Sequence, residues 1–312
     1  MHPTMPSTTP ALTASGVARD TPRRLAHRGD WRRLARGLYL PHARPPTEFD
    51  LASAVLHYAG RPALLTGRIA ARALGMRWIP AVERAQALVP AETRRRAHPL
   101  FGVRRTSRFA ELEPWTWSGL PVAPPERVVL DAALSACALR DARGIVMAAI
   151  EDRWTTAEGL RALLQHEPRN GTGLLRSAIR DSEAGAASPP EAELVDALRG
   201  CGLPFLANPE LRRGEVRIGF PDGYFVGLGA GWEVESRERH EGAESFDTTL
   251  RRHTIFAGHG VALAHVTPRQ IRADGHGTAA AVLAVSRARL LLPAAVREPA
   301  DLLVIPRGPL LQ

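Results

Sequence analysis

Three acidic residues have the types and the spacing of a divalent-cation site. Glu233 and Glu235 lie two positions apart in the segment GWEVESRERH, so in an extended strand both carboxylates point to one face of the sheet and the apolar residues beside them to the other. Asp222 lies in FPDGYF, at the end of the preceding extended segment. Mg²⁺ (or Mn²⁺) binds through a few carboxylate oxygens, with water and substrate phosphate completing its coordination shell. We therefore predict a metal site formed by Asp222, Glu233 and Glu235.

A metal held by these carboxylates would support phosphodiester hydrolysis. Such an ion activates water, neutralises phosphate oxygens and stabilises the leaving alkoxide. His240, five residues after Glu235, can serve as general acid or base, and Glu191 can add a carboxylate from an earlier helix. The alternative interpretation is a solvated strand face that carries acidic residues and no ion. The predicted catalytic residues are Asp222, Glu233, Glu235, His240 and Glu191.

Residues 186–292 contain the elements that would position this site. The segment SPPEAELVDALRGCG is typical of a helix that begins after Ser188. Three strands, a helix, a strand and a closing helix follow. The glycines of GLGAG run directly into a strand, so they indicate a tight turn rather than a dinucleotide-binding loop. Residues 293–312 fit neither a helix nor a strand. The six elements after the first helix are predicted at 204–211, 215–220, 230–236, 244–258, 261–268 and 278–292.

The same segments resemble a known family. Ser188-Pro189 with Glu191, Pro221-Asp222, WEVESRERH, TLRRH and LAHVTPRQIR occur in the order and spacing seen in actinobacterial members of the very-short-patch-repair-like branch of the PD-(D/E)xK nuclease superfamily. The resemblance implies a restriction-endonuclease-like α/β domain with a central mixed sheet, in which Asp222 and Glu233 bind the metal. It also implies an acidic residue rather than lysine at the last motif position. Glu235 occupies that position, where relatives usually carry Asp.

Positive charge is concentrated in the first part of the chain. The net charge is +9, but residues 1–120 hold 19 arginines against 8 acidic residues, whereas residues 121–312 hold 22 against 24. An arginine-rich module is typical of polyanion binding, because guanidinium groups make bidentate contacts to phosphate and guanine. The chain has no lysine, which excludes a P-loop lysine, a Schiff base and a lysine general base. Genomic bias explains the choice of arginine but not its uneven distribution.

Residues 1–45 are predicted to form a winged-helix DNA-binding domain. The pattern indicates a short helix near Leu12–Val17, an arginine-rich second helix, and two strands, Trp31–Ala35 and Leu38–Leu40, joined at a turn. This arrangement presents one helix to a DNA groove and the wing to the backbone. The alternative is a small helical unit whose arginines are merely solvated. The predicted DNA-binding residues are Arg23, Arg24, Arg28, Arg32, Arg33 and Arg36.

Residues 46–180 show a mixed α/β pattern. Together with the winged-helix region they loosely resemble winged-helix antitoxins of the AbiEi kind, through GVARDTPRRLAHRGDWRRLARGLYL, ALLTGRIAARALGM and SGLPVAPPERVVLDAA. In that family the winged helix binds promoter DNA. The resemblance therefore implies a DNA-binding regulator, with a toxin or another product of the same operon as its partner.

Two further features bear on location. No apolar segment approaches the length of a membrane span and no export signal is evident, so we expect a cytoplasmic protein without a membrane partner. Cys137 and Cys201 are too few for a disulfide framework, and both are expected to be buried thiols.

The predicted fold class is multi-domain α/β. The predicted function is DNA binding combined with metal-dependent endonuclease activity on DNA. Two alternatives are an antitoxin-like transcriptional regulator with a degenerate nuclease fold, and a nuclease that acts on RNA.

Overall fold

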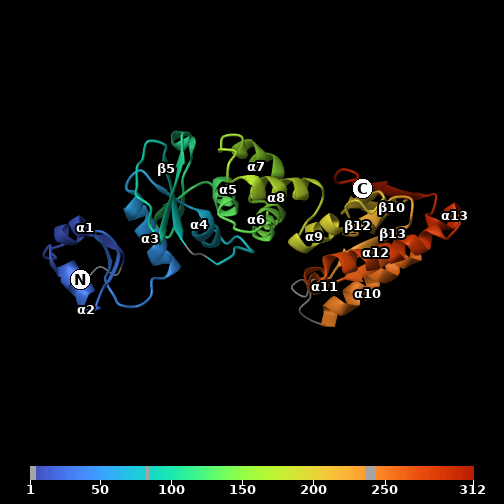
Figure 1. Ribbon diagram of the computed structural model, residues 1–312, viewed down its shortest axis with the longest axis horizontal. Helices are drawn as coiled ribbons and strands as arrows, with labels where there is room; N and C mark the ends of the chain where they lie inside the picture. Colours follow the sequence, from blue (N-terminus) through green and yellow to red (C-terminus); the bar gives the residue numbers. More distant parts are fainter. Residues whose placement is uncertain (1–4, 82–83, 236–242) are drawn as a thin grey trace. The chain divides into compact units, whose positions relative to one another are not determined.

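Two compact units make up the chain. The computed structural model describes residues 5–81, 84–235 and 243–312, and the chain divides into residues 1–175 and 176–312 (Figure 1). Each unit combines helices with sheets, so the predicted multi-domain α/β class is confirmed. The division falls within a helix that the sequence pattern did not predict. That helix is α8 (Gly173–Glu183).

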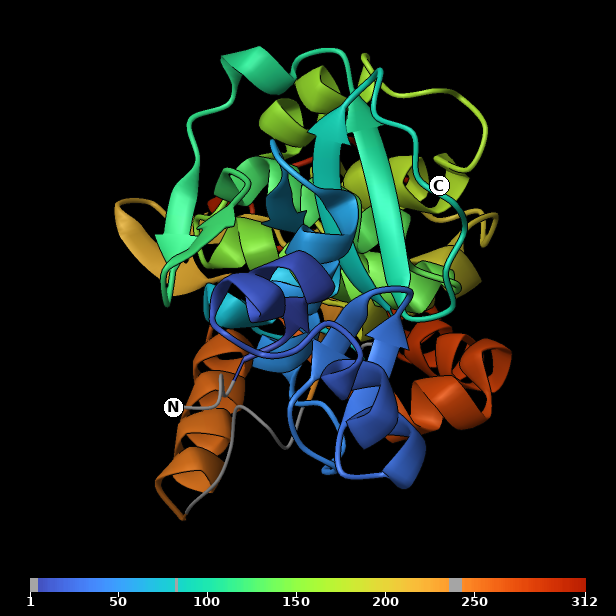
Figure 2. The same cartoon turned by 90° about the vertical axis from the view of Figure 1, so that its left-hand side faces the viewer.

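A small sheet with two helices begins the first unit (Figure 2). Its elements are β1 (Ser7–Thr8), α1 (Thr9–Ala14), α2 (Thr21–Arg28), β2 (Arg32–Ala35) and β3 (Leu38–Leu40). Helix α2 ends where Gly29 adopts a left-handed conformation with a φ of 84°. Strands β2 and β3 form the predicted hairpin, and β1 pairs with the other edge of β3. Leu12, Trp31 and Tyr39 form a buried cluster between these elements.

The rest of the first unit surrounds a five-stranded sheet in the order β6-β5-β4-β8-β7. Its elements are α3 (Glu48–Ala59), β4 (Leu64–Thr66), α4 (Gly67–Ala73), β5 (Ala85–Pro90), β6 (Phe101–Thr106), β7 (Trp115–Trp117), β8 (Leu120–Val122), α5 (Pro125–Leu134), α6 (Leu139–Glu151) and α7 (Ala157–Leu164). The buried carboxylate of Asp131 on α5 accepts a hydrogen bond from the Thr66 hydroxyl at 2.7 Å. It also pairs with Arg127 at 2.9 Å and with Arg104 at 3.0 Å. These contacts link α5 to strands β4 and β6.

A four-stranded mixed sheet forms the centre of the second unit. Its strands are β9 (Phe205–Ala207), β12 (Gly223–Phe225), β13 (Ala230–Val234) and β14 (Ala262–Val266), in the order β14-β13-β12-β9. Strand β12 is antiparallel to both β9 and β13, whereas β14 runs parallel to β13. A parallel pair needs a crossover connection, and helix α10 (Ala243–Gly258) lies in that connection.

Helices pack on both faces of this sheet. One face carries Trp232, which belongs to a buried cluster shared with α9 (Pro189–Leu198), α11 (Pro268–Ala273) and α12 (Gly275–Leu290). The opposite face carries Tyr224 and Leu263, which cluster with Phe256 of α10. Because side chains alternate along β13, Glu233 shares the face covered by α10.

The strand prediction was wrong around Asp222. In place of the single strand predicted at 204–211, the structure has two strands. The first is β9 of the central sheet, and the second belongs to a different sheet. The strand between β9 and β13 is the unpredicted β12, whose three residues are too few to show a period of two. The separated strands are β10 (Glu210–Arg213) and β11 (Val216–Gly219), which pair with each other.

The last twenty residues, which gave no prediction, contain a short helix and a strand. These are α13 (Ala294–Arg297) and β15 (Leu302–Ile305). Strand β15 pairs with β10, and its side chains Leu302 and Val304 pack against the cluster that contains Phe256. Leu311 bridges to Phe205 at the edge of the central sheet. Burial of these aliphatic side chains explains why the tail is ordered.

The cysteine prediction was wrong for Cys137, which is exposed because it lies in the connection between α5 and α6. Cys201 is half-buried against the core of the second unit. Among the described residues, no helix has the length and apolar character needed to cross a membrane.

The close approach of β12 to Trp232 gives a first prediction. A Cβ atom on Gly223 would lie 1.9 Å from the fully buried indole ring. Gly223→Ala should therefore destabilise the protein by about 1–3 kcal/mol, as overpacking of a core does. Gly258→Ala is the matched control, because a Cβ there meets nothing within 4 Å. Urea unfolding should show a lower midpoint for the first variant only; equal midpoints would contradict the packing argument.

Candidate metal centre

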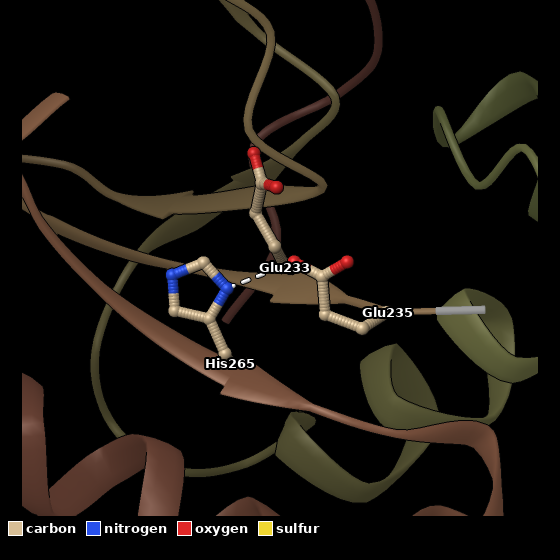
Figure 3. A group of neighbouring side chains, drawn as sticks. All are labelled: Glu233, Glu235 and His265. Atoms are coloured by element: carbon tan, nitrogen blue, oxygen red, sulfur yellow. Dashed lines mark hydrogen bonds and ion pairs between the residues drawn. The ribbon is translucent and has the colours of Figure 1, made fainter. Parts of the chain in front are cut away.

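Three side chains from two neighbouring strands converge in the second unit (Figure 3). Glu233 lies on β13, Glu235 follows that strand directly, and His265 lies on β14. Each offers a possible metal-ligand atom, and these atoms all lie within 4.8 Å of one another. The His265 Nδ1 atom lies 3.0 Å from the Glu235 Oε1 atom. We call these three residues the β13–β14 trio.

The strand ladder explains why the trio forms. Glu233 and His265 are partners in the parallel register between β13 and β14. The pairing continues past β13, because the Glu235 N–H donates to the Val266 carbonyl at 2.7 Å. Alternation along β13 then directs both glutamates to the same face, as the sequence predicted.

Asp222 lies next to the trio, at the start of β12. Gly223 pairs with Trp232, so Asp222 and Glu233 are opposite each other and share a face of the sheet. The Asp222 Oδ2 atom accepts a hydrogen bond from the Val234 N–H at 2.7 Å. The predicted ligands Glu233 and Glu235 therefore come together with His265, whereas Asp222 is their neighbour and is not a member of the trio.

Glu191 lies buried in the first turn of α9 and is 4% exposed. Its carboxylate accepts hydrogen bonds from the Ser188 hydroxyl at 2.7 Å, from the Ala187 N–H at 2.9 Å and from the Asn208 side-chain amide at 2.9 Å. These donors fix the position of the carboxylate. Glu191 is therefore held by donors from the segment before α9 and from Asn208, and it is not a member of the β13–β14 trio.

The carboxylates of Asp222, Glu233, Glu235 and Glu191 lie close enough to shift one another's pKa. Burial raises the pKa of Asp222 well above its usual range, and the nearby Glu191 and Glu233 carboxylates add to that shift. Burial also raises the pKa of Glu233, and the Glu235 and Glu191 carboxylates act in the same direction. The Arg252 guanidinium opposes both pKa shifts. At neutral pH a divalent cation would stabilise the ionised forms.

The guanidinium group of Arg252, on α10, forms an ion pair with Glu233. Its Nη2 atom donates to the Glu233 Oε1 atom at 2.7 Å and to the Phe220 carbonyl at 3.0 Å. The arginine side chain is about half-exposed, whereas Glu233 is almost completely buried. Arg252 therefore balances one carboxylate of the group from the solvent side.

The contacts of His265 and Arg252 with the acids of β13 were not predicted from the sequence. His265 and Arg252 lie in the motifs LAHVTPRQIR and TLRRH, and neither motif by itself predicts a contact with Glu233 or Glu235. Only the strand register and the crossover helix bring them to β13. His240 lies outside the described residues.

The predicted DNA-binding arginines lie in the N-terminal part of the first unit. Three belong to α2, two to β2, and one to the turn before β3. All six are exposed. Arg32 donates to the Ala43 and Arg44 carbonyls at 2.8 and 3.0 Å, and Arg28 pairs with Asp30 at 2.9 Å. The helix and the hairpin thus both present positive charge to solvent.

Comparison with known proteins gives limited similarity. Neither a protein-family model nor a curated protein matches the chain. Among solved structures, the chain is similar to the crystal structure of the RV2827C protein from Mycobacterium tuberculosis, with 20% sequence identity and a TM-score of 0.38. That similarity covers 61% of this chain and 74% of the other. These similarities assign no function to the chain.

Proposed function

We propose that this protein is a metal-dependent nuclease that binds DNA in the cytoplasm and hydrolyses phosphodiester bonds. The observation that carries the proposal is the group of acids at β12 and β13. Asp222, Glu233 and Glu235 lie beside the buried Glu191, and burial raises the pKa of both Asp222 and Glu233. Grouped carboxylates with raised pKa values are typical of functional sites, because an ion or substrate offsets their repulsion.

The donor set fits a divalent cation. Glu233 and Glu235 would hold it, with Asp222 and Glu191 contributing negative charge from adjacent positions. A bound cation would activate water and neutralise the phosphate oxygens. The protein's own residues keep the acids in place: the Val234 N–H orients Asp222, and Arg252 balances the charge of Glu233.

The central sheet and the arginines support the same proposal. Three antiparallel strands, a crossover helix and a fourth strand parallel to the third form a central mixed sheet of the kind that the nuclease resemblance implies. The exposed arginines of α2 and β2 are suited to the DNA backbone, because each can contact a phosphate.

A non-catalytic DNA-binding regulator is the second candidate. The ion pair between Arg252 and Glu233 favours it, because a guanidinium already neutralises the most buried acid of the β13–β14 trio. In this function the acids would be structural, and a toxin or another product of the same operon would be the partner.

Cleavage assays with the full-length protein test the proposal. Supercoiled plasmid, single-stranded DNA and single-stranded RNA are incubated with Mg²⁺, with Mn²⁺ or with EDTA. We expect DNA nicking that requires a divalent cation and stops with EDTA. Cleavage of RNA alone would contradict the assignment of DNA as substrate. DNA binding without cleavage, together with no heat of Mn²⁺ binding by calorimetry, would favour the regulator.

A further inference from the structure

We propose that His265 is a direct metal ligand and that the site selects a divalent first-row transition metal over Mg²⁺. This inference rests on the proposed metal-dependent function and names the class of ion that the same site takes. His265 lies thirty residues beyond Glu235 and was not among the predicted site residues.

The spacing within the β13–β14 trio is that of neighbouring ligands. The Glu235 Oε1 atom and the His265 Nδ1 atom are 3.0 Å apart. Two ligands at right angles on an ion, with bonds of about 2.1 Å, are also about 3.0 Å apart. Glu233 offers a third ligand atom within the same 4.8 Å span. An ion could therefore be bound with small side-chain adjustments on a fixed pair of strands.

The three residues of the β13–β14 trio differ in their exposure to solvent. Glu233 is 6% exposed, whereas the side chains of Glu235 and His265 are 24% and 29% exposed. The ring of His253, from α10, packs edge-on against the His265 ring with centroids 5.0 Å apart, which orients the imidazole. One ligand is thus held in the protein interior, and two are partly exposed to solvent, so an ion can reach them.

The nitrogen ligand decides the choice of ion. Mg²⁺ takes oxygen ligands and keeps much of its water shell. Affinity of a mixed nitrogen and oxygen site for first-row divalent metals increases from Mn²⁺ towards Cu²⁺, and imidazole is a common ligand of these ions. A site of two carboxylates and one imidazole therefore favours first-row transition metals over Mg²⁺. Of the two ions predicted from the sequence, Mg²⁺ and Mn²⁺, this site favours Mn²⁺.

Mn²⁺ is the probe for the test, because electron paramagnetic resonance detects hyperfine coupling from Mn²⁺ to a ligand nitrogen. Wild-type full-length protein should bind Mn²⁺ more tightly than Mg²⁺ and show this coupling. His265→Asn keeps an amide donor near the position of Nδ1 but has no imidazole. We expect it to lose the coupling and to bind Mn²⁺ at least roughly 10-fold more weakly, since even outer-shell partners affect affinity by that much.

Two controls separate the ligand from its neighbours. His276→Ala removes an exposed imidazole of α12 and should change neither affinity nor coupling. His253→Ala should keep the coupling; its loss there, with retention in His265→Asn, would assign the nitrogen to His253 and overturn the proposal. Circular dichroism confirms that each variant is folded. Mn²⁺ bound by the wild type without nitrogen coupling would overturn only the His265 assignment, whereas no Mn²⁺ binding at all would overturn the proposed function as well.

Discussion

Replacing Glu233 with Gln, or Asp222 with Asn, is expected to abolish metal-dependent phosphodiester cleavage by the full-length protein. Each substitution preserves the shape of the side chain and removes one negative charge from the group of acids at β12 and β13. Metal ions contribute several kcal/mol of transition-state stabilisation, and a loss of about 4 kcal/mol lowers a rate roughly 10³-fold. The initial rate of plasmid nicking in Mn²⁺ should therefore fall by about that factor or more.

The same variants are expected to be more stable than the wild type when no metal is bound. The folded-state pKa of Asp222 and of Glu233 is raised, so folding favours the protonated form of each group. This contribution is fully present below the unfolded-state pKa values of about 4, and it is lost as pH rises through the higher folded-state values. The side-chain amides of Asn and Gln do not ionise, so the variants do not lose this contribution as pH rises.

Melting temperatures measured between pH 4 and pH 8 in EDTA test this reasoning. The wild type should lose stability as pH rises over this range, and Asp222→Asn should lose less. Added Mn²⁺ should raise the melting temperature of the wild type but not that of the variants. Glu215→Gln is the control, because Glu215 is exposed in the turn between β10 and β11. Full nicking activity in Glu233→Gln would rule out a metal role for this carboxylate.

Removing four arginines from the N-terminal helix and hairpin is expected to eliminate most of the salt dependence of DNA binding. The substitutions are Arg23→Ala, Arg24→Ala, Arg32→Ala and Arg33→Ala, all at exposed positions. Each phosphate contact contributes about 0.9 to the slope of log K against log salt, so four contacts contribute about 3.6. The dissociation constant at 0.1 M salt should rise roughly 4 × 10³-fold, because each of the four contacts contributes about 0.9 log units there.

Fluorescence anisotropy with a labelled duplex, over a range of salt concentrations, measures this slope. The control is the double variant Arg77→Ala with Arg108→Ala. It is compared with the double variant Arg23→Ala with Arg24→Ala, which removes the same number of positive charges. Arg77 is exposed and Arg108 is partly exposed, but Arg77 pairs with Asp152 and Arg108 pairs with Glu111. We expect the control to keep the wild-type slope. An unchanged slope in the four-arginine variant would place DNA binding elsewhere on the chain.

Local patterns in the sequence predicted much of what short-range physics controls. Helix α2 and the hairpin β2–β3 occur where breakers and apolar residues indicated them. The glycine-rich segment GLGAG begins in the turn between β12 and β13 and runs into β13, as predicted. These features depend on neighbouring residues, so periodicity and turn chemistry suffice to predict them.

Prediction failed where elements are short or gain their stability from distant partners. Strand β12 has three residues, and its place in the centre of the sheet depends on pairing with β9 and β13. Strand β15 is stabilised by pairing with β10 and by packing of its side chains against a buried cluster. Neither dependence leaves a periodic signal in the segment itself.

In the candidate metal centre, a period of two along the strand places Glu233 and Glu235 on one face, so this pair could be predicted from local sequence. Their partners could not be predicted in this way, because they come from other elements. The parallel register of β14 brings His265 opposite Glu233, and the crossover helix brings Arg252 to the same carboxylate. Register and crossover are set by burial of side chains far apart in the chain, so no local pattern could specify these contacts.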